Sequence, residues 1–490
     1  MSAPDLFVFD NRYARLGAPH ATPVMPTPVR APALVVVNEA LARELGADPV
    51  RLRQPDAVEV FAGNRLAAGS EPVATAYAGH QFGQFVPSLG DGRAILLGEV
   101  VATDGRHRDV QLKGAGPTPY SRRGDGRAAL GPVLREYLVA EAFAALGIPT
   151  TRALAVVATG ERVFRDRPLP GAILVRVATS HLRVGTLQYH AARGDLAGLK
   201  RIADEAIARH VPEALDSDGP YRALLEHVVH RQAHLVARWL GIGFIHGVMN
   251  TDNCALSGET LDYGPCAFLD AYDPLRVLSS IDRTGRYAFG RQPQILSWNL
   301  ARCAEALVPL LDADTDRAVE IATQILDAYA PAFWSAHATV YGPKLGLTTW
   351  DEQDRELLDD FLALLASQAA DYTRAFRALG AAAVGELEPL RREFTDPSAT
   401  DAWLARWRTR LREEPQSDRR QLIEAHNPVY IPRNHLVEAA IVAAEDEGDY
   451  GPFHALRAVL EDPFHERVGL DRYAAAPEPH EIVTATFCGT

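Results

Sequence analysis

The most informative segment of the sequence is Gly243-Phe244-Ile245-His246-Gly247-Val248-Met249-Asn250-Thr251-Asp252-Asn253. An amphipathic segment over 220–240 precedes it and is predicted to be a long helix, and a strand is expected directly after it. The stretch itself gathers histidine, asparagine and aspartate, whose side chains transfer protons or bind metals. A polar loop between a long helix and a strand indicates a catalytic loop.

The spacing inside this loop matches one half of the catalytic loop of protein kinases. In kinases, counting from the histidine, the catalytic aspartate lies two residues on and a metal-binding asparagine seven on. Counted from His246, Asn253 is in the metal position, but Val248 stands where the base belongs. An acidic group appears instead at Asp252. The sequence therefore predicts a loop that keeps its metal ligand and has lost its usual base.

The residues after the loop are expected to form a hairpin that turns at Gly258-Glu259. Pairing across this turn would set Ala255 opposite Asp262, so Asn253 and Asp262 would project to the same side, roughly 7–8 Å apart at the backbone. That separation suits two oxygen ligands of one Mg²⁺. Asp262-Tyr263-Gly264 then corresponds to a variant of the kinase D-F-G motif. The alternative is an exposed acidic hairpin.

Upstream of the loop the pattern is rich in strands. Alternation over 108–113 puts Val110 and Leu112 on one face of a strand and Lys113 on the other, in the form of the kinase phosphate lysine. Glu136 follows on a helix that contains Pro132 in its first turn, and in kinases such a glutamate holds the lysine. Taken singly, both residues are typical of surface charges, and their order carries the interpretation. Strands are expected over 94–101, 108–113, 153–159 and 172–179.

Two further groups of residues are candidates for nucleotide contacts. Gly90-Asp91-Gly92-Arg93 precedes a strand, and glycines let backbone N–H groups approach a phosphate, although a plain turn has the same pattern. Arg176 lies inside an apolar strand and Arg183 follows seven residues later, and a buried charge is costly unless it is paired. Their role is either an internal ion pair or a fork for the end of a polyphosphate.

The order of these segments predicts an α+β, two-lobed, protein-kinase-like fold. Residues 1–75 contain many prolines and are expected to be an N-terminal extension, with a short helix capped by Asn38 and stopped at Gly46. Residues 76–185 would form the strand-rich lobe with its one helix. Residues 186–490 would form the larger helical lobe, with helices over 196–211, 220–240, 295–311, 316–329, 351–379 and 401–413.

Composition narrows the class of protein further. Of 490 residues, 50 are basic and 63 acidic, and the net charge of −13 argues against a nucleic-acid or membrane-surface partner. No secretory signal and no long apolar run are visible, and the four cysteines have no C-x-x-C spacing, which fits a cytoplasmic protein. A disulfide scaffold or zinc site is not expected.

With these residues placed, the sequence closely resembles the SelO/YdiU family of pseudokinases, which are protein adenylyltransferases. Four long strings carry the resemblance, which extends over most of the chain: Tyr77-Ala-Gly-His80-Gln-Phe-Gly83, Gln111-Leu-Lys113-Gly-Ala-Gly116-Pro-Thr-Pro-Tyr120-Ser-Arg-Arg-Gly-Asp125-Gly126-Arg127, His246-Gly-Val-Met-Asn-Thr-Asp252-Asn253, and Asn427-Pro-Val-Tyr-Ile-Pro-Arg-Asn434-His435.

The resemblance implies an activity. Members of the family transfer AMP from ATP to serine, threonine and tyrosine hydroxyls of proteins, with UMP transfer also described, and use Mg²⁺ or Mn²⁺. They bind ATP in a flipped orientation, so the α-phosphorus faces the acceptor. The resemblance leaves the choices between ATP and UTP and between Mg²⁺ and Mn²⁺ open, as it does the protein substrates.

It also assigns a role to each candidate residue. Asp252 would accept the proton, and Asn253 and Asp262 would hold the metal. The nucleotide would contact Gly90, Gly92, Arg93, Lys113 (held by Glu136), Asp125, Gly126, Arg176, Arg183 and, through the metal, Asp262.

Two points stay open at the level of sequence. Family members often end in a selenocysteine or cysteine, and Cys488 stands third from the end here, so a redox role with an unassigned partner is implied. The rival functions are a phosphotransferase acting on a small molecule or a protein and a non-catalytic ATP-binding scaffold. Val248 disfavours the first, and the joint presence of Lys113, Glu136, Asn253 and Asp262 disfavours the second.

Overall fold

A computed structural model describes residues 3–414 and 418–487. Cys488 lies outside the described residues. The N-terminal part is built on an antiparallel sheet with the strand order β1-β3-β6-β7-β10-β9-β2, and β8 also pairs with β10. Its strands are β1 (Ala21–Pro23), β2 (Ala33–Val37), β3 (Val73–Thr75), β6 (Ala94–Val101), β7 (His107–Lys113), β8 (Ala128–Ala129), β9 (Arg152–Phe164) and β10 (Pro168–Ala178).

The two faces of this sheet are covered by different helices. Leu112 and Val175 pack with the short helices α2 (Glu39–Glu44) and α3 (Pro55–Phe61). Leu174, one residue away, faces the other side, where α4 (Leu130–Ala145) covers the sheet. Lys113 opposes Leu174 in the β7–β10 register, so the predicted alternation of β7 is confirmed and its lysine lies on the α4 side.

Residues 1–75 are tied into this sheet. They supply its strands β1, β2 and β3 as well as the two helices of one face. The predicted cap of α2 is confirmed, since the side chain of Asn38 accepts a hydrogen bond from the backbone N–H of Leu41. Gly46 follows the helix with a φ of 75°, the left-handed conformation that favours glycine. The division of the chain into three domains stays a prediction.

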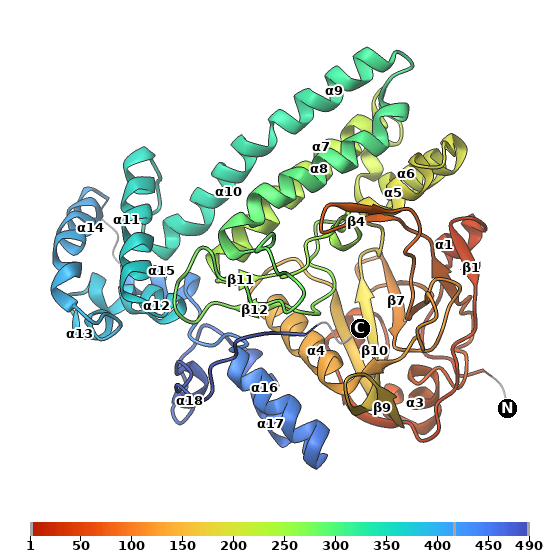
Figure 1. The fold of residues 1–490 in the computed structure, drawn as a ribbon, viewed down its shortest axis with the longest axis horizontal. Helices are drawn as coiled ribbons and strands as arrows, with labels where there is room; N and C mark the ends of the chain where they lie inside the picture. The colour runs from red at the N-terminus through yellow and green to blue at the C-terminus, as the bar shows by residue number, and fades with distance from the viewer. Residues whose placement is uncertain (1–2, 415–417, 488–490) are drawn as a thin grey trace.

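The rest of the chain is mainly helical (Figure 1). The long helices α7 and α8 pack against each other, and α10 and α9 extend the same layer, while α16 and α17 pack on α4 from below in Figure 1. The helices are α5 (Val184–Ala191), α6 (Leu196–His210), α7 (Pro220–Gly241), α8 (Gln292–Leu311), α9 (Thr315–Asp327), α10 (Tyr329–Lys344), α11 (Glu352–Gln368), α12 (Tyr372–Ala383), α13 (Glu388–Arg391), α14 (Asp401–Glu413), α15 (Arg419–His426), α16 (Asn434–Val442), α17 (Gly451–Leu460), α18 (Asp471–Ala474) and, near the N-terminus, α1 (Arg12–Leu16).

Two predicted elements are wrong. The segment 351–379 is two helices, because Ala369 adopts a left-handed φ of 50° and Asp371 then caps α12 by accepting from Arg374. The hairpin at Gly258-Glu259 does not form. Ala255 bridges to Arg183 instead of Asp262, because the chain after the catalytic loop pairs with the start of α5.

No helix of the described residues combines the length and the apolar character needed to cross a membrane.

Candidate functional site

The centre of the site is a buried cluster of two cations and two carboxylates. The Nζ atom of Lys113 lies 2.5 Å from Glu136 Oε2 and also pairs with Asp262 Oδ1. Arg176 Nη1 lies 3.1 Å from the other oxygen of Glu136, and its Nε and Nη2 donate to Gln111 Oε1. The predicted contact between Lys113 and Glu136 is thereby confirmed. For Arg176, the structure shows the internal ion pair.

Asp262 is held as a carboxylate by this cluster. Burial raises its pKa, but the positive charges of Lys113, Arg176 and Arg93 outweigh burial and hold the pKa far below its ordinary value. Its φ of 67° is unusual for a residue other than glycine, so the backbone turns sharply at this position. An ionised carboxylate therefore faces Lys113.

Asp252 lies in the catalytic loop, in the short 3₁₀ turn Thr251–Asn253. Only 8% of the residue is exposed, and burial raises the pKa of its carboxyl to about 6. Its Oδ2 accepts from Gln81 Nε2 at 3.4 Å, and its Oδ1 is buried with no hydrogen-bond partner among the described residues. Asp252 thus has an oxygen that is not used in holding the loop together.

Arg183 contributes a buried cation next to this carboxylate. Its Nη1 donates to the backbone oxygen of Asp252 at 3.0 Å, its Nε donates to His181 O, and its guanidinium stacks on the Tyr77 ring at 4.3 Å. Its Nη2 is buried and has no hydrogen-bond partner within residues 3–414 and 418–487. Unlike Arg176, Arg183 keeps a donor that a ligand can use.

The catalytic loop and Asp262 are joined by His246. Its Nε2 lies 3.0 Å from Leu261 O, directly before Asp262, and its Nδ1 accepts from Val248 N at 3.4 Å. Burial lowers the pKa of His246, which favours the neutral ring that these two contacts need. The histidine therefore fixes the position of Asp262 relative to the loop that carries Asp252.

The glycines directly before β6 allow close packing. A Cβ at Gly90, where φ is 64°, would lie 2.2 Å from the Tyr120 ring, and a Cβ at Gly92 would lie 3.0 Å from Tyr120 O. The loop that contains Tyr120 is held against this turn by Thr118, whose hydroxyl donates to Asp91 O at 2.6 Å. A phosphate-binding role of Gly90 and Gly92 stays a prediction.

Asp125 and Gly126 lie at the end of that loop. Asp125 is exposed, and its carboxylate pairs with Arg165, 2.9 Å away, rather than with the Lys113 cluster. Gly126 has a φ of 65° and packs against Gly116, where a Cβ would stand 2.1 Å from backbone atoms. Their nucleotide contacts stay a prediction.

The residues present fit a divalent metal that arrives with a nucleotide. Asn253 Nδ2 donates to Val248 O at 2.9 Å, which orients its amide, and Asp262 supplies the ionised oxygen. Among the described residues no group of three or more His, Cys, Asp and Glu side chains could hold a metal alone. Mg²⁺ commonly binds through one or two carboxylates together with substrate phosphates, which suits so sparse a set of ligands.

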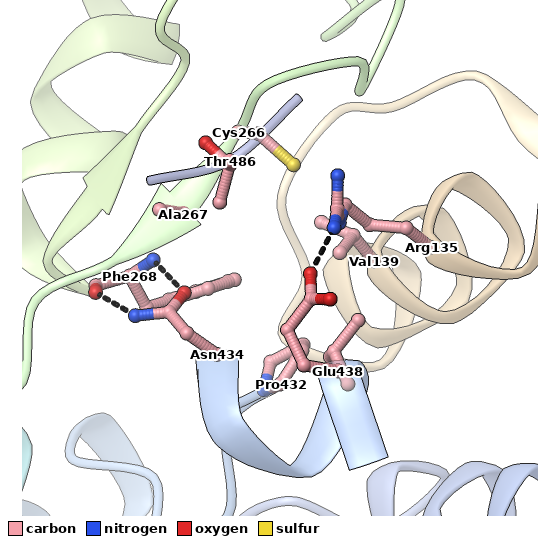
Figure 2. A pocket seen from close by; sticks show the side chains of 10 residues that line it. Arg135, Val139, Cys266, Ala267, Phe268, Pro432, Asn434, Glu438 and Thr486 are labelled. Carbon is pink, nitrogen blue, oxygen red and sulfur yellow. Dashed lines mark hydrogen bonds and ion pairs between the residues drawn. The ribbon is translucent and has the colours of Figure 1, made fainter. Parts of the chain in front are cut away.

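Side chains of α4 and α16 hold the segment that follows Asp262 in place (Figure 2). Arg135, the neighbour of Glu136 on α4, donates from Nη1 to Gly264 O at 3.2 Å and to Phe487 O at 3.1 Å, and its Nη2 pairs with Glu438 on α16. Asn434 pairs with both the N–H and the C=O of Phe268, as a neighbouring strand would. The C-terminal residues and α16 therefore hold the backbone beyond the metal-ligand candidate.

Sequence reasoning missed the residues that hold Asp252. The hairpin of β4 (Gly79–Gln81) and β5 (Gln84–Val86) lies against the catalytic loop. His80 N donates to Thr251 Oγ1 at 2.7 Å, and Thr251 in turn donates to Gln188 Oε1. A Cβ at Gly79 would stand 2.5 Å from Asp252 Oδ1. The only signal in the sequence was the family string over 77–83, which carries no chemistry by itself.

The three buried cysteines Cys254, Cys266 and Cys303 are free thiols. Burial raises the pKa of Cys266 to about 12, so this thiol stays protonated.

Comparison with known proteins gives the class of this site. Residues 6–461 match the family described as "Protein adenylyltransferase SelO". The chain is 59% identical over 488 residues to "Protein nucleotidyltransferase YdiU" of Rhodopseudomonas palustris, strain BisB5, and 58% identical over 495 residues to the protein of the same name from Methylorubrum populi. Each alignment covers 99% of this chain and 99% of the relative.

These matches define an enzyme of the nucleotidyltransferase class. The chain belongs to the SelO family of protein adenylyltransferases.

Proposed function

We propose that this enzyme transfers AMP from ATP to serine, threonine or tyrosine hydroxyls of other proteins, with UMP transfer from UTP as a related reaction. The observation that carries the proposal is the buried pair of Asp252 and Arg183, each with one atom left unpartnered by the described residues. Val248, at the base position of a kinase loop, is apolar and buried. A proton acceptor and a hydrogen-bond donor for a phosphate are thus both available, but in an arrangement unlike that of a kinase.

The reaction follows from these groups. The acceptor hydroxyl oxygen attacks the α-phosphorus, a new O–P bond forms, and the bond between the α-phosphorus and the bridging oxygen breaks, so pyrophosphate leaves. Asp252 takes the hydroxyl proton on its unpartnered Oδ1. Burial raises the pKa of Asp252 to about 6, which is closer to neutral pH than the pKa of an exposed aspartate. Asp252 is therefore a stronger base than an exposed aspartate.

The position of the one N–H donor of the two arginines that has no partner among the described residues supports a flipped orientation of ATP. Arg176 is already paired with Glu136 and Gln111, whereas Arg183 keeps its Nη2. We assign the γ-phosphate to Arg183, with Arg176 adding its charge, and the phosphates nearer the adenosine to Lys113. Gly90, Gly92, Arg93, Asp125 and Gly126 would then line the remainder of the nucleotide.

Asn253 and Asp262 would hold Mg²⁺ or Mn²⁺, and the ion would neutralise charge on the phosphates. Binding it would require Asp262 to share the carboxylate that now pairs with Lys113.

The test uses ATP labelled at either the α- or the γ-phosphorus, incubated with the enzyme, Mg²⁺ or Mn²⁺, and bacterial protein. We expect the α-label to stay on protein through a bond that resists gel denaturation, and the γ-label to leave as pyrophosphate. Retention of the γ-label alone would identify a kinase and overturn the proposal. A matched sample of the Asp262→Ala variant separates enzymatic labelling from background.

A further inference from the structure

The hairpin β4–β5 lies beside the catalytic loop, and hydrogen bonds at its turn hold it there. Phe82 and Gly83 form its two-residue turn, with φ values of 51° and 83°, as in the tight turns that join twisted antiparallel strands. Phe82 N donates to Asn250 Oδ1 and to Tyr287 OH, both at 3.1 Å. Gly79 and Gln81 face Asp252, so by strand alternation His80 faces away from it. The outer face of the hairpin is therefore held one strand away from the proposed base.

A cluster of aromatic and cationic side chains lies on that outer face, and we name it the Trp298 platform. Its members are His80, Phe85, Arg286, Trp298 and Arg302. The His80 ring packs edge-on against Trp298, with ring centres 5.1 Å apart, and lies tilted against Phe85 at 4.9 Å. The guanidinium of Arg286 lies 4.9 Å from the indole centre, and that of Arg302 lies 5.0 Å from it. Phe85 is 40% exposed, so the platform reaches the surface.

The two arginines of this platform differ in their partners. Arg302 pairs with Glu305 at 2.5 Å, but Arg286 forms no ion pair with any described residue. The nearest acid along the chain, Asp282, is occupied, since its two oxygens accept the backbone N–H groups of Arg286 and Tyr287 at 2.9 and 2.7 Å. One of the two guanidinium groups of the platform, that of Arg286, is therefore left without a paired carboxylate among the described residues.

We infer that the Trp298 platform docks an acidic segment of the protein substrate, and this inference rests on the proposed function. A guanidinium that lies over an indole can still bind a carboxylate in a fork through the N–H groups at its edge. A carboxylate of the substrate would supply the partner that the guanidinium of Arg286 lacks, and such a charge pair favours the encounter and selects the partner.

A rival explanation is that Arg286 and Arg302 only brace the hairpin. The two explanations differ in one measurable property. If the arginines brace the hairpin, replacing them disturbs the catalytic loop equally for every acceptor. If they dock a substrate, the loss depends on the charge of the acceptor.

The test uses two fluorescein-labelled peptides with a central tyrosine, one flanked by glutamates and the other by glutamines at the same positions. Fluorescence anisotropy measures binding to the full chain. We expect the glutamate peptide to bind at least about tenfold more tightly at low salt, and the preference to vanish in the Arg286→Gln/Arg302→Gln variant. The control is Arg222→Gln, which removes a partly exposed helical arginine paired with Glu226 on α7 and should keep the preference.

Equal binding of both peptides to the unaltered enzyme, or an unchanged preference in the double variant, would overturn the inference. Should the double variant unfold, Arg286→Lys serves in its place, because it keeps the charge and loses the fork, and we expect it to lose most of the preference. Transfer of α-label to either peptide is scored separately. Charge-dependent binding without any transfer would refute the proposed function and leave the docking surface standing.

Discussion

The substitution Asp252→Asn separates proton transfer from every structural role of this side chain. An asparagine has nearly the same shape and keeps an oxygen, so it can still accept from Gln81 Nε2. It cannot take a proton at neutral pH. If Asp252 only held the loop, the asparagine variant would work almost as well as the natural enzyme, and the alanine variant would not.

The expected magnitude follows from the contacts. The bond to Gln81 is long, 3.4 Å, and the Oδ1 atom has no described partner, so the loop loses at most about 1 kcal/mol of stability with either substitution. Removing a general base slows a reaction by about 10²–10⁴-fold, or roughly 2.7–5.4 kcal/mol in activation free energy. The expected rise in activation free energy is therefore larger than the expected loss of stability.

Three measurements check this expectation. The rate of α-label transfer should fall by about the same factor in Asp252→Asn and Asp252→Ala. The dissociation constant of ATP, measured by calorimetry with Mg²⁺ present, should change little, and so should the melting temperature. An asparagine variant that retains more than about a tenth of the rate refutes the role of Asp252 as the base.

Two other substitutions test the site, and a third tests a buried lysine of the helical part. Asp262→Ala should abolish transfer and the metal dependence of ATP affinity, because it removes the ionised ligand; calorimetry with and without Mg²⁺ checks this, and normal Mg²⁺-dependent binding would contradict it. Gly79→Ala should slow transfer while ATP still binds, because its Cβ would stand 2.5 Å from Asp252 Oδ1 and push the carboxylate away; an unimpaired rate would show that the close approach is unimportant. Burial lowers the pKa of Lys344 to about 7 from 10.5, so between these values the unfolded chain binds a proton that the folded chain does not, and stability rises with pH. Urea unfolding at pH 7 and pH 9 should therefore show the natural protein gaining stability relative to Lys344→Met at the higher pH, and a constant difference would refute it.

The parts of the fold that local pattern controls could be predicted from the sequence. The period of two in β7 places Val110 and Leu112 in one core and Lys113 on the other face, because burial of an apolar face fixes which side each residue takes. The helix α14 was expected over Asp401–Glu413 and has those bounds. The contact of Lys113 with Glu136 was also predicted, since an ordered series of motif residues specifies it.

The residues after the catalytic loop could not be predicted in this way. Gly258-Glu259 has the composition of a hairpin turn, but the pairing of a short strand is decided by what lies beside it. Here Val184 N donates to Cys254 O and Leu256 N donates to Leu182 O, so a segment about seventy residues earlier takes the place of the expected partner strand. Likewise no local pattern indicates that Gln81 contacts Asp252 across 171 positions.

The charges of the central cluster would explain why the proposed metal ion and Arg183 are both needed. Lys113 and Arg176 are balanced by Glu136 and Asp262, so these four groups together carry no net charge to offer a triphosphate. Arg93 adds a positive charge that acts on Asp262, and Arg183 adds a buried one whose Nη2 has no hydrogen-bond partner among the described residues. A divalent ion on Asn253 and Asp262 would draw Asp262 away from Lys113 and free that ammonium group for the phosphates. Metal binding and phosphate binding should therefore be strongly cooperative at this site, each raising the affinity for the other by the same factor.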